Sequence, residues 1–432
     1  MFEQSSGNKL HRQTGERGKC AVLALGKWRR TLKQEHIGFP YLQLADSLAM
    51  VGVVLTPTWQ LTRKINCEEV VSRVKNTIGA WKAGKFMPLV SRPFSLNTYA
   101  LSKAYFRLGS VDLRNDDIKS IASACKSYCY ADMLLKPSEV LLYRSVEEGG
   151  LGLQNIQCRA QAALITTFLQ TAINPRFQPS LYHQWLYNYH VDEDRTLPNP
   201  GYPPFYKEAF FMIIRKFKKE SMENIAHVTM RQWYQYLLGQ NVTEREVDAE
   251  GRKEVVPCRI ERKLPDVLWG EIYRVSRLKG LCPEEKSFSL KLIHELLPVK
   301  KRVKEIIPTT VPTCWCDDGL DESLLHAFYE CPKNAEAATA LLRLVKVYDK
   351  DMTPIKSLRL EFRVEEIYTL TVATMLVTGL HYIWKQRLKK KTTSLFNIRA
   401  ELEAAVFLRR RSSNRRIREA GVMMSNTLIN FF

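Results

Sequence analysis

Apolar residues recur with a helical period along much of the chain. One face of the segment that follows Asn66 is apolar, and Asn66 with Glu69 has the spacing of a capping box, so we expect a helix to begin at Asn66. The same pattern predicts helices over residues 97–108, 115–129 and 155–173. We therefore expect a mainly α fold.

Two short apolar runs before these helices are typical of strands. AVLALGKW (residues 21–28) contains a glycine near its end, and LAMVGVVL (residues 48–55) has Gly52 inside it and Pro57 after it. We expect each run to form one strand. Because two strands alone make an incomplete domain, we also expect the chain to begin in the middle of a fold.

Length and charge narrow the class of protein. A chain of 432 residues with 45% hydrophobic residues can fold into about two to four domains. Lys and Arg number 65 against 45 Asp and Glu, a net charge of +20 that predicts a polyanionic partner. Ten irregularly spaced cysteines and no recognisable signal peptide are typical of a reducing compartment, so we expect a nuclear or cytoplasmic protein.

Four side chains suited to a metal lie within PTCWCDDGLDESLLHAFYECP, residues 312–332. Cys314, Cys316, His326 and Cys331 supply the thiols and imidazole that tetrahedral Zn²⁺ prefers. His326 and Cys331 lie five apart at the end of a predicted helix, whose last turn must loosen to bring both to one ion. The alternative is four reduced, half-buried side chains, and the Cys-x-Cys opening is tighter than the usual gap of about two to four residues. A zinc ion with four protein ligands would be structural, because no position remains for a catalytic water.

Basic residues concentrate in two segments. Residues 385–418 contain twelve Lys and Arg against Glu401 and Glu403, and a shorter run (PVKKRVK, residues 298–304) precedes the Cys/His group. Such segments bind RNA or DNA phosphates without sequence preference, and the alternative is a solvated helix face. The candidate nucleic-acid-binding residues are Lys300, Lys301, Arg302, Lys304, Lys385, Arg387, Lys389, Lys390, Lys391, Arg409, Arg410, Arg411, Arg415 and Arg416.

Several other stretches invite a functional interpretation that we do not favour. The apolar segment 367–384 barely reaches membrane-spanning length and contains threonines, so we expect a buried core helix. The glycine-rich turn 149–152 lacks the Gly-Lys-Ser/Thr ending of a P-loop, so we expect a structural turn. In YADM (residues 130–133) a methionine stands where polymerase chemistry needs a second aspartate, so we expect no catalysis there. Trp28 and Trp384 lie beside basic residues, where a core role is favoured over base stacking.

Several motifs stand in an order typical of a known family. Along the chain come SSGNKLHR and VLALGKW, then LAMVGVVL, then SRPFSLNTYALSKAYFRL (residues 91–108), then EGGLGL (148–153), and finally HELLPVKKRVKEIIP (294–308) ahead of the Cys/His group. In this order the chain resembles the C-terminal half of the reverse transcriptase of LINE-type, non-LTR retrotransposons. The resemblance covers most of the chain except residues 176–281, and it departs from the family where the knuckle opens Cys-x-Cys rather than Cys-x-x-Cys.

This resemblance implies a fold, a role and partners. It places the catalytic aspartates before Met1, so we expect no polymerase activity from this chain alone, and Mg²⁺ only in a full-length parent enzyme. The implied role is to hold RNA and DNA during target-primed reverse transcription, with structural Zn²⁺, no membrane and no small-molecule substrate. The alternative is a non-enzymatic, zinc-dependent nucleic-acid-binding protein derived from such an element. The expected domains are a palm remnant (1–60), a thumb-like helical module (61–175), a helical linker (176–290), a CCHC zinc knuckle region (291–345) and a basic C-terminal helical region (346–432).

Overall fold

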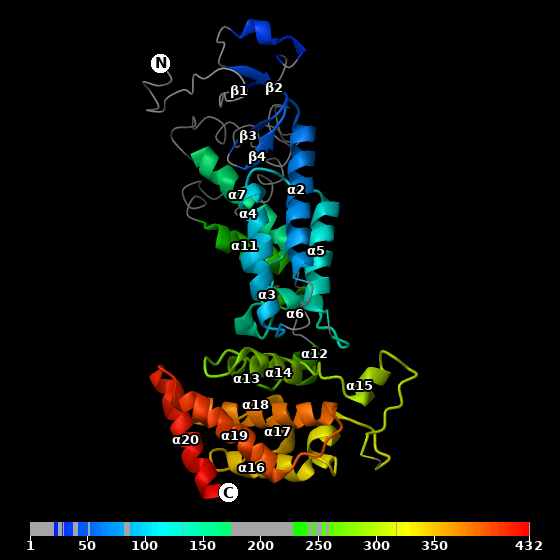
Figure 1. Cartoon of the computed structure of the whole chain (residues 1–432), viewed down its shortest axis with the longest axis vertical. Helices are drawn as coiled ribbons and strands as arrows, with labels where there is room; N and C mark the ends of the chain where they lie inside the picture. The colour runs from blue at the N-terminus through cyan, green and yellow to red at the C-terminus, as the bar shows by residue number, and fades with distance from the viewer. Residues whose placement is uncertain are drawn as a thin grey trace. The chain divides into compact units, whose positions relative to one another are not determined.

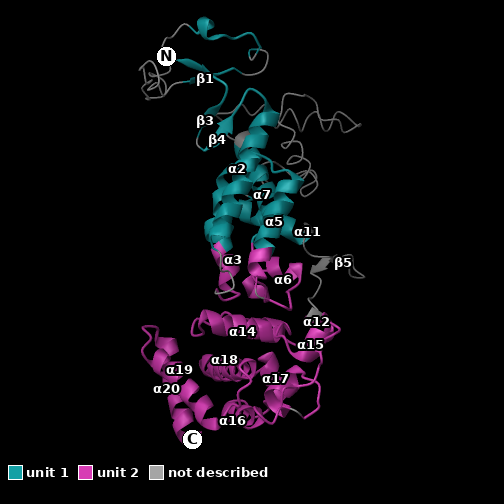
Figure 2. Cartoon of the chain, turned by 45° about the vertical axis from the view of Figure 1, so that its right-hand side comes forward, with its two compact units in different colours: residues 1–82, 96–126, 154–241 teal, residues 83–95, 127–153, 242–432 magenta. Residues whose placement is uncertain are grey.

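The fold is mainly helical, 63% helix and 4% strand, which confirms the predicted fold class (Figure 1). The chain divides into two compact units, coloured separately in Figure 2, and each is described here by itself. Unit 1 comprises residues 1–82, 96–126 and 154–241, and unit 2 comprises residues 83–95, 127–153 and 242–432. The computed structural model describes residues 21–24, 28, 30–37, 42–50, 52–81, 87–131, 133–173, 228–241, 245–247, 253–255, 259–316 and 318–431. Much of the expected linker (174–227) and the first twenty residues therefore lie outside the described part.

The strands of unit 1 differ from the sequence prediction. β1 (Ala21–Leu23) pairs in parallel with β2 (Gln43–Ala45), which the hydrophobic pattern did not predict. The run at residues 48–55 forms two strands rather than one, because β3 (Leu48–Met50) pairs antiparallel with β4 (Val53–Leu55). Gly52 takes a φ of +81° between them, a conformation that side chains other than glycine rarely adopt. The glycine thus marks a hairpin turn, not an irregularity within one strand.

Long helices make up the rest of unit 1. Asn66 lies in the middle of the first one and does not cap it, which corrects the prediction. Its buried side chain accepts a hydrogen bond from the Val54 amide (2.9 Å) and donates one to the Val54 carbonyl (2.7 Å), so it joins the helix to the hairpin. The predicted apolar stripe of residues 115–129 is confirmed, since Ile121, Cys125 and Cys129 are buried. The helices are α2 (Trp59–Ala80), the π-helix η4 (Leu96–Leu101), α4 (Ser102–Leu108), α5 (Asn115–Cys129, whose last residues belong to unit 2), α7 (Ile156–Ile173) and α11 (Met230–Asn241), with a 3-10 turn η2 (Gln34–His36) before them.

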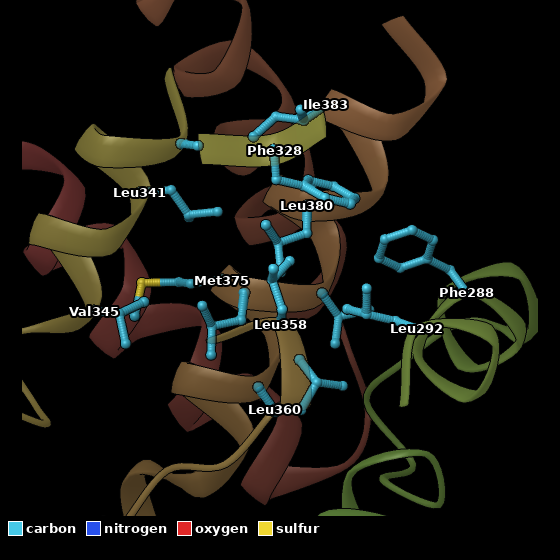
Figure 3. Packing of buried hydrophobic residues seen from close by; sticks show 14 of the residues in the cluster. Phe288, Leu292, Phe328, Leu341, Val345, Leu358, Leu360, Met375, Leu380 and Ile383 are labelled. Atoms are coloured by element: carbon cyan, nitrogen blue, oxygen red, sulfur yellow. The ribbon is translucent and has the colours of Figure 1, made fainter. Parts of the chain in front are cut away.

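Unit 2 is built around one buried helix, α18 (Glu366–Leu388), which packs against α14, α16, α19 and α20. Met375, Leu380 and Ile383 from this helix are fully buried among apolar side chains of its neighbours (Figure 3). The helix is long and apolar enough to cross a membrane by length and composition, yet 67% of its apolar window is buried inside the protein. The other elements are α3 (Ser91–Ser95), α6 (Glu139–Tyr143), η5 (Val146–Glu148), β5 (Arg245–Val247), β6 (Lys253–Val255), α12 (Arg259–Lys263), α13 (Trp269–Val275), α14 (Pro283–Ile293), α15 (Lys300–Lys304), the π-helix η6 (His326–Glu330), α16 (Ala335–Val345), α17 (Pro354–Arg359), α19 (Leu395–Arg410) and α20 (Arg415–Phe431).

The glycine-rich turn after η5 is a packing element, as predicted. Gly149 takes a φ of +76°, and a Cβ added to it would lie 2.3 Å from the ring of Tyr273. His294 contacts the Gly149 carbonyl at 2.9 Å through its Nε2, and burial lowers the pKa of this histidine. At Gly150 an added Cβ would lie 2.1 Å from the carbonyl oxygen of Arg144. The turn therefore uses glycine so that two backbone segments and an aromatic ring can approach closely.

Candidate metal centre and basic surfaces

The structure brings the four predicted ligands together in unit 2. The ligand atoms of Cys314, Cys316, His326 and Cys331 all lie within 4.8 Å of one another. Cys314, His326 and Cys331 are buried, and Cys316 is partly buried. The cysteines are free thiols, and the 3.9 Å between Sγ of Cys314 and Sγ of Cys331 is far beyond the length of a disulfide bond, about 2.05 Å. These four residues are called the knuckle cluster below.

A short hairpin presents the two N-terminal thiols of the knuckle cluster. Thr313 and Asp321 form an antiparallel bridge, and the Cys314 amide donates to the Leu320 carbonyl at 2.9 Å. Gly319 takes a φ of +75° in the connecting turn, which explains a glycine at that position. Cys316 lies in the turn itself, so both thiols are held by backbone geometry.

A π-helical turn presents the other two ligands. In an α-helix, residues five apart point about 140° away from each other around the helix axis. Here η6 replaces the α-helical turn, and the Cys331 amide donates to the His326 carbonyl five residues earlier, at 2.8 Å. The wider turn brings the imidazole and the thiol to one point. The predicted loosening of the last helical turn is therefore confirmed.

Two distances within the knuckle cluster match the separations expected around a tetrahedral ion. Tetrahedral bonds of about 2.3 Å to sulfur and 2.05 Å to nitrogen place two sulfurs about 3.8 Å apart, and a sulfur and a nitrogen about 3.6 Å apart. The observed separations are 3.9 Å from Cys314 Sγ to Cys331 Sγ and 3.4 Å from Cys316 Sγ to His326 Nε2. Three sulfurs and one imidazole are also the donor set of a closed zinc site. The knuckle cluster could therefore hold a metal ion such as structural zinc.

The surroundings of the ligands bear on how a cation would bind. Burial raises the pKa of the Cys316 and Cys331 thiols, so without a cation they stay protonated near neutral pH, and a metal that binds must displace these protons. Nδ1 of His326 is buried, has no hydrogen-bond partner among the described residues and lies 3.9 Å from a carboxylate oxygen of Glu330. An imidazole that binds a metal through Nε2 commonly has its other nitrogen near a carboxylate.

A fully buried carboxylate, Glu322, fixes the knuckle to two basic segments. Its Oε1 accepts a hydrogen bond from Arg387 Nε at 2.8 Å, and its Oε2 forms a second contact with the same guanidinium. The same Oε2 accepts from the amide of Lys300 at 2.9 Å, and the backbone carbonyl of Glu322 accepts from the amide of Lys301 at 3.1 Å. A hydrogen bond from the Thr393 amide to the Lys333 carbonyl (3.0 Å) ties the chain after α18 to the chain after the cluster. The start of α15 and the end of α18 therefore both lie beside the knuckle.

The structure divides the predicted nucleic-acid-binding residues by exposure. Arg387 and Arg409 are largely buried in ion pairs with Glu322 and Glu285, so they are not on the surface. Lys300 donates from its Nζ to the Thr313 carbonyl at 2.8 Å. Arg302 contacts Glu305, Arg415 contacts Glu419, and Arg411 lies over the ring of Phe407. The exposed members without a recorded ion pair within the described ranges are Lys301, Lys304, Lys385, Lys389, Lys390, Lys391 and Arg410.

The aromatic candidates also separate. Trp384 is 6% exposed and stacks on Phe328, with ring centroids 5.9 Å apart. The guanidinium of Arg387 lies over the Trp384 ring, 4.6 Å from its centroid. Its predicted core role is confirmed. Trp28 is 58% exposed, so the core role predicted for it is wrong. The prediction that YADM (residues 130–133) is not catalytic concerns a motif that is only partly described, because Asp132 lies outside the described residues.

Sequence reasoning missed the partner of Glu322. The carboxylate was visible between the ligands, but Arg387 lies 65 residues further along the chain. Nothing in the basic sequence around residue 387 distinguishes the buried Arg387 from its exposed neighbours.

The fold and the knuckle cluster define a mainly helical protein with a four-residue group able to hold a metal ion. Comparison of the chain with protein-family models gives no match, and comparison with curated proteins gives none.

Proposed function

We propose that this chain is a nucleic-acid-binding part of a LINE-type reverse transcriptase, and that unit 2 binds RNA or DNA beside a zinc-held knuckle. The motifs that resemble this family support the proposal, together with the geometry of the knuckle cluster. The proposal covers binding alone and assigns no polymerase step to the chain.

The observation that carries the proposal is the position of Glu322. One buried carboxylate bonds to the first amide of α15 and to Arg387 in the last turn of α18. Two lysine-rich segments that are remote in sequence are thereby held beside the same hairpin. Their exposed side chains, which have no recorded ion pair among the described residues, are Lys301 and Lys304 from α15, and Lys389, Lys390 and Lys391 after α18.

Five exposed lysines give the proposal a measurable consequence. Binding that neutralises phosphates releases counterions, and for single strands the logarithm of affinity falls with the logarithm of salt by about 0.7 per contact. Five contacts correspond to a slope of about −3.5. This slope separates phosphate binding from the solvated helix face that charge alone also allows.

Zinc in this proposal has a structural role. Cys314, Cys316, His326 and Cys331 would hold it, and the ion would supply a fixed hairpin rather than a reactive centre. The nucleic acid would be bound by lysines of α15, whose position depends on the hairpin. The hairpin backbone accepts hydrogen bonds from the side chain of Lys300 and from the amide of Lys301.

A salt titration of RNA binding tests the proposal. Lys301→Gln/Lys304→Gln removes two exposed charges that have no recorded partner, so we expect the salt slope to become shallower by about 1.4. The matched control is Lys346→Gln/Lys350→Gln, which removes two exposed lysines at the end of α16. Equal slopes for the wild type and both variants would show that the knuckle lysines do not contact phosphate.

A further inference from the structure

A second basic site lies away from the knuckle in unit 2. A cleft of about 690 Å³ is lined by the α13–α14 connection, the first turn of α18 and the start of α20. Its volume is in the range of about 300–1,000 Å³ that ligand sites occupy. Three of its cations, Arg274, Arg277 and Lys279, lie outside both basic segments that the sequence pattern indicated.

Two of the four cations of this cleft lie near the same carboxylate oxygen. Arg274 from α13 reaches Oε1 of Glu366 at 3.3 Å, and Arg416 from α20 lies 3.7 Å from the same oxygen. Glu366 is 70% exposed at the start of α18, so a single solvent-accessible carboxylate oxygen sits between two arginines. Both guanidinium groups thus already lie near the position of one anionic oxygen, and Nη1 of Arg274 also lies 3.6 Å from a carboxylate oxygen of Glu271.

Two further cations in the cleft have no recorded carboxylate partner within the described residues. Arg277 and Lys279 are exposed and flank Leu278 in the α13–α14 connection. The only acidic lining residues are Glu366 and Glu419, and Glu419 pairs with Arg415 at 2.7 Å. The cleft therefore carries more positive than negative charge.

Aliphatic side chains line the same cleft. Leu278, Ile367, Leu370 and Ile417 contribute to its wall, and the wall is close-packed where an added Cβ at Gly280 would lie 2.6 Å from Leu370. A site that combines cations with an apolar wall suits a group that is charged at one end and flat and apolar at the other. A nucleotide has this character, with a phosphate and a base.

We infer that this cleft binds a nucleotide unit of an unpaired RNA or DNA strand. The phosphate takes the position of the Glu366 carboxylate among the four cations of the cleft, and the base lies against the aliphatic wall. A paired base is stacked inside a duplex and cannot enter a hollow, so the cleft selects single strands. The inference rests on the proposed function, because it assumes that the chain binds nucleic acid, and it adds a second contact point to the knuckle lysines.

Replacing Glu366 tests the inference by an expected gain of affinity rather than a loss. Its carboxylate occupies the arginines that would otherwise meet the phosphate, so Glu366→Gln should strengthen binding of a single strand. Gain of affinity cannot arise from misfolding. Glu403→Gln is the matched control, because Glu403 is a 53% exposed carboxylate paired with Arg399 on α19, outside the cleft.

The experiment measures fluorescence anisotropy of a labelled twelve-nucleotide oligo(U) across a salt series, with the full chain. We expect Arg277→Gln/Lys279→Gln to make the salt slope shallower by about 1.4 relative to Lys346→Gln/Lys350→Gln. We also expect Glu366→Gln to bind more tightly than Glu403→Gln. A twelve-base-pair RNA duplex should show neither difference.

The outcomes separate this inference from the proposed function. If the wild-type chain binds oligo(U) with a phosphate-dependent slope but the cleft variants match their controls, the cleft inference is overturned and the proposed function stands. If the wild type binds no nucleic acid, both fail. Equal effects on oligo(U) and duplex would overturn the assignment to unpaired strands.

Discussion

Replacing Glu322 with glutamine tests how the knuckle is held. The side chain of Glu322 is 0% exposed, and its carboxylate contacts the guanidinium of Arg387, which is 11% exposed. Glutamine keeps the shape but removes the charge, so the arginine is left buried without a counterion. Breaking a buried pair from one side costs about 3–5 kcal/mol. Glu403→Gln breaks an ion pair of exposed side chains and should cost at most about 1 kcal/mol.

Hydrogen exchange measures this loss where it occurs. Because about 1.4 kcal/mol corresponds to a factor of ten, a loss of 3 kcal/mol should speed exchange of protected amides about a hundredfold in α15 and the last turn of α18. Adding Arg387→Met to Glu322→Gln removes the orphaned charge and should recover most of the protection. Exchange in Glu322→Gln as slow as in Glu403→Gln would refute the role of this ion pair.

Three further predictions concern the metal, the glycine turn and pH. Cys331→Ser should abolish stoichiometric zinc binding, measured as metal content after dialysis, whereas Cys282→Ser, an exposed cysteine outside the knuckle cluster, should leave it unchanged. Gly149→Ala places a Cβ 2.3 Å from Tyr273 at a φ of +76° and should destabilise unit 2 by about 3 kcal/mol in urea unfolding; an unchanged midpoint would contradict the close packing. Burial lowers the pKa of His381 from 6.5 to about 4, so the unfolded chain binds the extra proton first and stability is lost as pH falls below about 6.5. Between pH 7 and 5 this loss of stability is about 2 kcal/mol. The variant His381→Phe should lack this part of the pH dependence of unfolding. An equally steep pH dependence in His381→Phe would contradict the prediction.

The helices were predictable because burial of one face imposes a period on the sequence. The stripe that ends at Cys129 follows that rule, whereas α7 buries the four consecutive residues 162–165 and is therefore buried on most sides. Asn66 did not, although it has the spacing of a capping box. The side-chain carboxamide of Asn66 instead bonds to the backbone N–H and carbonyl of Val54, and these contacts depend on where the hairpin folds back. Local spacing cannot distinguish a cap from a side chain that satisfies a distant strand.

The ligands of the knuckle cluster were predictable for a different reason. The identity of Cys314, Cys316, His326 and Cys331 carries their chemistry, so a short window of sequence was enough. The hairpin at residues 48–55 was missed because Gly52 allows either an irregular strand or a turn, and the pairing of β3 with β4 decides between them.

The charge of the C-terminal region has two uses that sequence counting cannot separate. Arg387 and Arg409 contribute to the count, yet each neutralises a buried carboxylate from another helix or hairpin. These pairs fix α18 and α19, the helices that end in exposed cations such as Lys389 and Arg410. The buried arginines therefore position the exposed cations. Under the proposed function, removing a buried arginine should weaken nucleic-acid binding through loss of structure rather than loss of a phosphate contact. The two effects differ in the salt slope, because misplacement lowers affinity at every salt concentration while a lost contact changes the slope itself.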